Sequence, residues 1–153
     1  MLDLVDDTYV DVPPARLSAL VRDPARWPSW WPDLVLDLTR DRGDKGVQWA
    51  VRPAPWVPAG RREAVRWTGT AEIWLEPWRE RGTVLHHYQR LDPLTPPRLA
   101  ARQVDRLRAG RATAWKHHVH RLKDEVEARR DGCTGRPART GQDEEPSRRS
   151  LGR

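Results

Sequence analysis

The stretch Arg26-Trp27-Pro28-Ser29-Trp30-Trp31-Pro32-Asp33 holds three of the chain's nine tryptophans, together with two prolines. Proline fixes φ and has no backbone donor, so neither a long helix nor a central strand can pass through Pro28 and Pro32. We therefore expect a tight corner around which the indoles pack. Upstream of it, the sequence predicts a strand over Thr8–Val12 and an amphipathic helix over Ala15–Arg22.

Downstream of the corner, apolar residues alternate with polar ones at the period of a half-buried strand. The alternation predicts four strands, over Leu34–Thr39, Val47–Arg52, Ala71–Glu76 and Thr83–Leu91. Glycines and polar residues predict hairpin turns at Arg42–Gly46 and Glu80–Gly82. The prolines and glycine of Pro53–Arg62 predict an irregular loop, which leaves room for one further strand, Glu63–Thr68, before a break at Gly69.

The end of the chain divides into a long helix and a tail. Trp115, Val119, Leu122 and Val126 recur at i, i+4, i+7 and i+11, and Val104 and Leu107 extend this stripe upstream. Such a helix needs a surface to pack on. Residues 131–153 are rich in Gly, Pro, Arg, Glu and Ser, so we expect a disordered tail after one folded domain of residues 1–130.

Composition limits the functional classes. The formal net charge is +6, which would favour nucleic acid or anionic membrane as a partner, but nearly all the positive charge is arginine and the charges alternate in sign along the chain. Such a preference for arginine over lysine is typical of a GC-rich genome. No apolar run approaches the ~20 residues of a membrane span, and the acidic N-terminus is unlike a signal peptide, so we expect a soluble, cytoplasmic protein. The single cysteine, Cys133, cannot form an internal disulfide.

Four segments together resemble the START-like superfamily, also called SRPBCC, which includes polyketide cyclase/dehydrase and lipid-transport proteins. They are Asp11–Leu17, Asp23–Pro32, Gly69–Pro77 and Gly82–Leu85, and the resemblance extends over residues 8 to 129. It implies an α+β helix-grip fold, in which a curved antiparallel sheet wraps around a long C-terminal helix and two short helices follow the first strand. It also implies a hydrophobic cavity between the sheet and that helix.

The resemblance implies that the cavity binds a hydrophobic small molecule, either lipid-like or polyketide-like. In the family, the strand face that carries Leu85 and Leu91 would point to the cavity. Family members usually have an additional pair of strands where this chain has Pro53–Arg62, so the cavity is expected to be reduced. The expected ligand-binding residues are Trp49, Val51, Trp56, Ile73, Leu85, His87, Gln89, Arg111, Trp115 and His118.

Alternative functions remain open at this point. A cyclase or aromatase would use the same cavity, and His87 and His118 are its candidate catalytic residues, because histidine titrates near neutral pH. These side chains are better explained as satisfied polar groups at a cavity rim.

A module that binds nucleic acid, a ribosome or a protein would need exposed aromatics surrounded by arginine, and Trp74 is the one candidate. His117 and His120 could share one side of a helix, as zinc ligands do, but both fall off the apolar stripe and are expected to be solvated. The sequence therefore predicts no metal site and no cofactor. Ligand identity and oligomeric state are left open.

Overall fold

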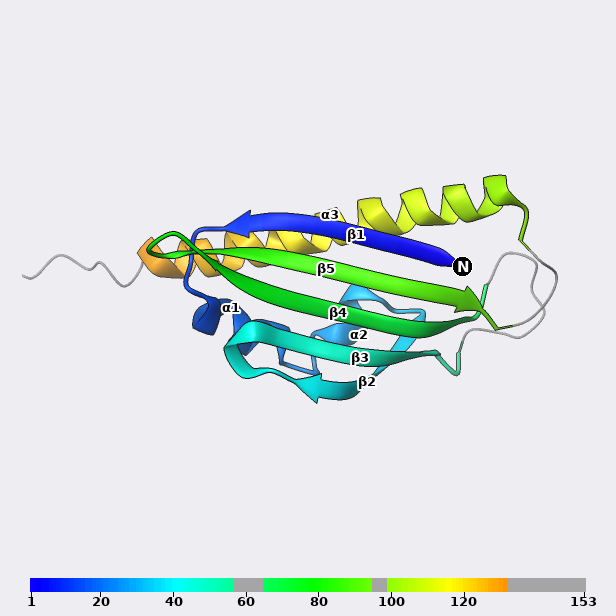
Figure 1. The fold of residues 1–153 in the computed structure, drawn as a ribbon, viewed down its shortest axis with the longest axis horizontal. Helices are drawn as coiled ribbons and strands as arrows, with labels where there is room; N and C mark the ends of the chain where they lie inside the picture. Colours follow the sequence, from blue (N-terminus) through cyan, green and yellow to red (C-terminus); the bar gives the residue numbers. More distant parts are fainter. Residues whose placement is uncertain (57–64, 95–98, 132–153) are drawn as a thin grey trace, which may run out of the picture.

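The computed structural model describes residues 1–56, 65–94 and 99–131, with only the backbone of Arg130 and Asp131. Five antiparallel strands form a single sheet in the order β1-β5-β4-β3-β2 (Figure 1). Their bounds are Leu2–Val10 for β1, Leu34–Asp41 for β2, Gly46–Pro53 for β3, Trp67–Trp78 for β4 and Gly82–Pro93 for β5.

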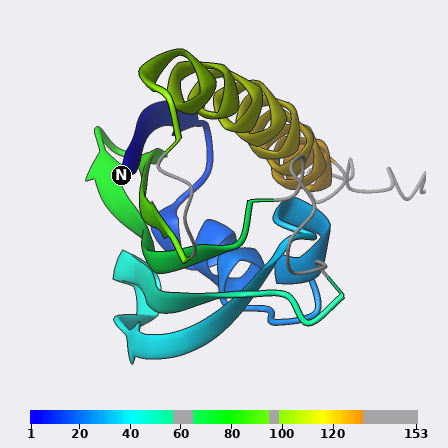
Figure 2. The same ribbon diagram turned by 90° about the vertical axis from the view of Figure 1, so that its right-hand side faces the viewer.

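The helices lie on one side of this sheet. Two short ones, α1 (Pro14–Val21) and α2 (Trp27–Trp30), connect β1 to β2, and a 3-10 turn, η1 (Gly43–Lys45), connects β2 to β3. The long helix α3 (Ala101–Asp131) closes the described chain. Viewed from the end, the sheet curves around the three α-helices (Figure 2). The α+β helix-grip arrangement and the pair of short helices are therefore as predicted from the sequence.

The core fills the space between the sheet and α3. Four apolar residues of the α3 stripe are buried, namely Trp115, Val119, Leu122 and Val126. Val104 and Leu107 continue this stripe and are partly buried. Burial of this face provides the hydrophobic stabilisation that a long solvent-exposed helix would lack.

Two strand predictions need correction. Strand β1 begins at Leu2, six residues before the predicted start, because Leu2 and Leu4 alternate inward like Thr8 and Val10. Strand β4 does not break at Gly69 but runs through it as one element, and residues 65 and 66 precede it outside any strand.

Gly69 lies within β4 instead of ending it. Its φ is 151°, and a Cβ atom there would lie 2.0 Å from the carbonyl oxygen of Arg90 on the neighbouring strand. Only glycine allows so close an approach of two backbones.

Part of what the sequence predicts lies outside the described residues. This applies to most of the Pro53–Arg62 loop, to Glu63 and to the tail from residue 132 with Cys133. Within the described ranges, no helix is both long enough and apolar enough to cross a membrane.

Candidate functional site

The inner face of β5 carries the polar residues of the candidate site. Strand register places His87 between Ile73 of β4 and Asp6 of β1. Gln89 lies two residues further on, on the same face. The side chains of His87 and Gln89 are buried, with 0% and 2% of their surface exposed. Two polar side chains thus point into the apolar interior between the sheet and α3.

Three nearly parallel rings meet at this point. The Trp115 indole on α3 stacks on the His87 imidazole with centroids 3.9 Å apart. The Trp31 indole lies 5.4 Å from the Trp115 ring with planes inclined by 6°, and 5.3 Å from the His87 ring with planes inclined by 19°. Trp31 therefore connects the corner after α2 with both the sheet and the long helix, and indoles occupy the space between them here.

The neighbouring tryptophans meet this stack edge-on. Trp49 of β3 contacts Trp31 at 6.2 Å and Trp27 at 5.2 Å, both in T-shaped geometry. Trp30 contacts Trp115 at 6.2 Å, again with perpendicular planes. The Trp27 indole donates a hydrogen bond to the carbonyl of Val21, so one of these polar groups is satisfied. The edge-to-face contacts are the favourable geometry for aromatic pairs.

Five polar atoms in this interior have no hydrogen-bond partner among the described residues. They are Trp49 Nε1, both ring nitrogens of His87, and both amide atoms of Gln89. Each buried polar group left unpaired costs about 1–3 kcal/mol, and folded proteins contain few of them. Such a cluster on one sheet face is therefore a feature to be explained by function.

The electrostatics of the interior keep His87 neutral. Burial lowers the pKa of the His87 imidazole to about 3, against the opposing influence of the Asp6 carboxylate. Asp6 itself is paired: it accepts a hydrogen bond from Trp115 Nε1 at 3.1 Å and lies 2.6 Å from Lys116 Nζ. A neutral imidazole offers one donor and one acceptor. The site thus presents donors and acceptors without a free charge.

The corner is fastened to α3 at both ends. Arg26 donates two hydrogen bonds of 2.8 Å to Glu125. At the other end, Asp33 forms an ion pair with Arg111, whose guanidinium also lies 5.6 Å from the Trp67 ring centroid. The two attachment points are about 21 Å apart along the helix, at 1.5 Å per residue. Trp30 and Trp31 lie between these two ion pairs.

The structure brings most of the expected ligand-binding residues together. Seven of them are buried: Trp49, Val51, Ile73, Leu85, His87, Gln89 and Trp115. Arg111 and His118 are partly buried on α3. Arg111 pairs with Asp33, while burial and the neighbouring His117 and Arg121 lower the pKa of His118.

Trp56 is placed differently. Its side chain is 64% exposed, and its Nε1 donates to the carbonyl of Pro32 on the surface of the corner. The structure therefore does not place Trp56 with the buried residues of the site.

Sequence reasoning missed three residues of this site: Asp6, Trp31 and Asp33. Asp6 faces His87 only because β1 begins at Leu2, and the alternation of Leu2 with Leu4 was the available signal. Trp31 and Asp33 belong to the corner that decides the fold, but no periodic pattern shows which of its side chains point inward.

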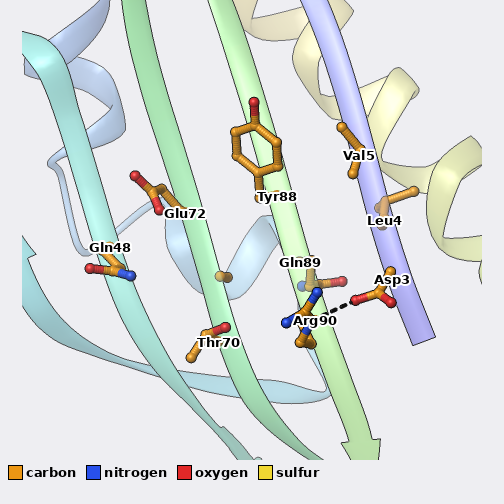
Figure 3. Close-up of a pocket in the computed structure, with 10 residues that line it drawn as sticks. Asp3, Leu4, Val5, Gln48, Thr70, Glu72, Tyr88, Gln89 and Arg90 are labelled. Atoms are coloured by element: carbon orange, nitrogen blue, oxygen red, sulfur yellow. Dashed lines mark hydrogen bonds and ion pairs between the residues drawn. The ribbon is translucent and has the colours of Figure 1, made fainter. Parts of the chain in front are cut away.

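The outer face of the sheet has a hollow of its own, of about 360 Å³. Tyr88 and Arg90 of β5 line it beside Thr70 and Glu72 of β4, as Figure 3 shows. Its charged groups are paired, since Arg90 donates to Asp3 at 2.8 Å and Glu72 forms an ion pair with Arg42. Arg90 and Glu72 therefore already have partners of opposite charge.

Trp74 lies on this outer face, 39% exposed, and stacks on His86 with centroids 5.1 Å apart. His86 in turn contacts two carboxylates, Asp7 and Glu76. A platform for nucleic acid needs free arginines around its aromatics. The carboxylates here do not favour that alternative.

The histidines do not converge on a metal site. His86 and His87 point to opposite faces of β5, and His117 and His120 are exposed on α3. Within the described part of the chain, no three side chains of His, Cys, Asp or Glu are grouped so that they could hold a metal ion.

Comparison with known proteins rests on structure. No protein-family model matches the chain, and no curated protein sequence matches it. A Mesorhizobium loti protein, MLL2253, is similar with a TM-score of 0.57 and 16% identity, over 83% of this chain and 97% of that one. DR_A0006 of Deinococcus radiodurans is similar with a TM-score of 0.53 and 18% identity, over 82% of this chain and 98% of that one.

A third similar structure is the Zhui aromatase/cyclase of Streptomyces sp. R1128. Its TM-score is 0.51 and its identity 14%, over 88% of this chain and 98% of that one. Identities this low are evidence for the fold. The chain has the α+β helix-grip fold that its resemblance to the START-like superfamily implied.

Proposed function

We propose that the protein binds a hydrophobic small molecule, lipid-like or polyketide-like, between the inner face of the sheet and α3. The observation that carries this proposal is the cluster of buried, unpaired polar atoms on His87, Gln89 and Trp49 within an aromatic interior. Ligand sites in proteins combine apolar and aromatic walls with a few polar groups that fix orientation. This interior has that composition.

Apolar contacts and polar hydrogen bonds are expected to contribute differently to the free energy of ligand binding. Burial of apolar ligand surface contributes ~25 cal/mol per Å² and provides most of the affinity. A ligand carbonyl or hydroxyl that pairs with His87 or Gln89 adds about 0.5–1.5 kcal/mol for each hydrogen bond. Because these groups have no hydrogen-bond partner among the described residues, pairing with the ligand removes a cost that the free protein carries.

A cyclase or aromatase that uses the same interior is the second candidate. It is supported by the fold shared with the Zhui aromatase/cyclase. Acid–base catalysis near neutral pH works best with a group whose pKa lies near the working pH. The pKa of His87, about 3, is far from that range, so binding is the function that this geometry supports better.

Two measurements test the proposal. Native mass spectrometry of freshly purified protein should detect a co-purifying apolar compound. Quenching of tryptophan fluorescence by added fatty acids and polyketides should then give dissociation constants for wild type and for Gln89→Met.

We expect weaker binding of the polar ligands by Gln89→Met, because the amide is lost from the interior. Gln48→Met is the matched control, since Gln48 is partly buried on the outer face. Equal affinities of wild type, Gln89→Met and Gln48→Met would contradict the proposed site. Absence of binding to every compound tested would contradict the proposed function.

A further inference from the structure

The corner residue Trp31 has the position that a flat ligand ring would take. Its indole is 4% exposed and nearly parallel to both Trp115 and His87. The unpaired ring nitrogens of His87 belong to the same stack. The chain therefore places one of its own aromatic rings against the surface that the proposed function assigns to a ligand.

Trp31 lies in the short connection between α2 and β2, where its N–H donates to the carbonyl of Trp27 and its carbonyl accepts from the N–H of Leu34. It is the residue after α2, with φ −137° and ψ 79°, so it lies outside the helix and ahead of Pro32. The backbone N–H of Ala54 donates to Asp33 at 3.0 Å and holds the start of β2. The side chain of Asp33 pairs with Arg111 of α3. This ion pair lies two residues from Trp31 and is nearer to it in sequence than the other ion pair between the corner and the helix, Arg26–Glu125.

We infer that Trp31 is an internal stand-in for the ligand: a flat, uncharged aromatic ring takes the place of its indole against Trp115 and His87, and the Asp33–Arg111 ion pair holds the indole in place until then. This inference rests on the proposed function and concerns how the same site is filled and opened.

The chemistry of the interior limits the ligand to an uncharged ring at its buried end. Asp6 is the acidic group beside His87, and it is already paired with Lys116 and with the Trp115 indole. A buried charge on the ligand would therefore have no free partner there, and an unpaired buried charge is costly. A hydroxyl or carbonyl on the ring edge can instead pair with His87 or Gln89.

Displacement of an internal group weakens the apparent affinity. If only a fraction of molecules has Trp31 outside the stack, the observed dissociation constant is the intrinsic one divided by that fraction. Weakening the ion pair raises the fraction without altering any group that touches the ligand. Asp33→Asn is therefore expected to bind a suitable ring about two- to fivefold more tightly than wild type.

The experiment uses 2-naphthol, a flat uncharged probe with one hydroxyl, and the full chain labelled with 5-fluorotryptophan. Fluorine NMR then gives one signal for each tryptophan, and the Trp31 signal is identified by its loss in Trp31→Phe. We expect saturation with 2-naphthol to shift the Trp31 signal toward that of Trp56, which is 64% exposed. Naphthalene-2-sulfonate, the charged counterpart, should not bind at the same concentration.

The matched control is Asp41→Asn. Asp41 pairs with Arg22 and its side chain is 36% exposed, against 37% for Asp33, but it lies at the far end of β2. We expect Asp41→Asn to bind 2-naphthol like wild type.

Other outcomes separate the two proposals. Binding of 2-naphthol with an unmoved Trp31 signal, or equal affinities of Asp33→Asn and Asp41→Asn, would overturn the stand-in and leave the proposed function standing. If Trp31→Ala binds 2-naphthol but wild type and Asp33→Asn do not, the probe only fills the cavity left by the indole. That result would also overturn the claim that the Asp33–Arg111 ion pair holds Trp31 in place. Equal binding of the sulfonate would overturn the uncharged ligand class. No binding of 2-naphthol by wild type, Asp33→Asn or Trp31→Ala, while a fatty acid or polyketide still binds, would overturn the flat-ring ligand class. Failure of all these compounds to bind would overturn the proposed function itself.

Discussion

The imidazole of His87 lies flat on the indole of Trp115, with centroids 3.9 Å apart and planes inclined by 24°. This contact joins the middle of β5 to the middle of α3. The Trp115 Nε1 also donates a hydrogen bond to Asp6 on the neighbouring strand β1. The stack is thus both a part of the core and the floor of the proposed ligand site.

Trp115→Ala should destabilise the protein by about 3–5 kcal/mol, the usual cost of emptying a large aromatic position in a core. The measurement is urea unfolding followed by circular dichroism. Trp56→Ala is the control, because Trp56 is 64% exposed and should change the free energy of unfolding by far less. Similar losses in both variants would show that α3 does not depend on its Trp115 contact.

Gln89→Met should stabilise the folded protein while it weakens ligand binding. Replacing an unpaired buried polar group by an apolar one of similar shape removes a cost of about 1–3 kcal/mol. Urea unfolding of Gln89→Met and Gln48→Met measures the effect. A loss of stability in Gln89→Met would mean that the amide has a structural partner, and the functional interpretation of the unpaired atoms would then be wrong.

The sequence predicts the fold better than the site. Period-two alternation is enough to locate β2, β3 and β5 and the second half of β4, and the Trp115–Val126 spacing is enough to orient α3. The alternation also predicts correctly that His87 and Gln89 share a face with Leu85. It cannot show what fills the space above that face, because the inward direction of Trp31 depends on the corner between two prolines, and no periodicity applies there.

Long-range pairing explains the other misses. The Asp33–Arg111 and Arg26–Glu125 ion pairs join residues that are 78 and 99 positions apart. A single sequence has no local signal for such partners. Gly69 illustrates the converse, because a glycine in this pattern predicts a break, whereas β4 continues through it and its backbone lies close to that of β5.

His86 should make the stability of the protein depend on pH above neutrality. Burial disfavours its charge, but hydrogen bonds to Asp7 and Glu76 outweigh that effect and raise the pKa of the imidazole. A raised pKa in the folded state contributes stability that is present below about pH 6.5, the unfolded value. This contribution is lost as the pH rises through the folded value.

Wild type should therefore exceed His86→Gln in stability at pH 6 by up to about 1 kcal/mol, with the difference shrinking toward pH 9. Thermal melts across this range measure it, with His120→Gln on the exposed side of α3 as control. A difference that grows with pH would show that the carboxylates do not hold a charged imidazole.

His87 should make the stability of the protein depend on pH in the opposite direction to His86, and at lower pH. Its pKa is lowered to about 3 in the folded protein, so its contribution to stability is present above about pH 6.5 and is lost on acidification toward pH 3. Between pH 7 and pH 4.5, wild type should lose about 2–3 kcal/mol more than His87→Leu. Equal acid sensitivity of the two proteins would indicate that the ring reaches solvent or a partner.

The same variant distinguishes a binding protein from an enzyme. If His87 only orients a ligand, His87→Leu should weaken binding by a hydrogen bond's worth, about 0.5–1.5 kcal/mol, and no turnover should be found in either protein. If His87 instead moves a proton in a cyclisation, its loss should slow turnover by about 10²–10⁴-fold while binding is largely retained. Fluorescence quenching measures the binding, and mass spectrometry of a polyketide substrate measures the turnover.

We expect the loss of binding alone, because an imidazole with a pKa near 3 is a poor proton acceptor at neutral pH. Conversion of a polyketide by wild type that disappears in His87→Leu, with quenching preserved, would assign the interior to catalysis.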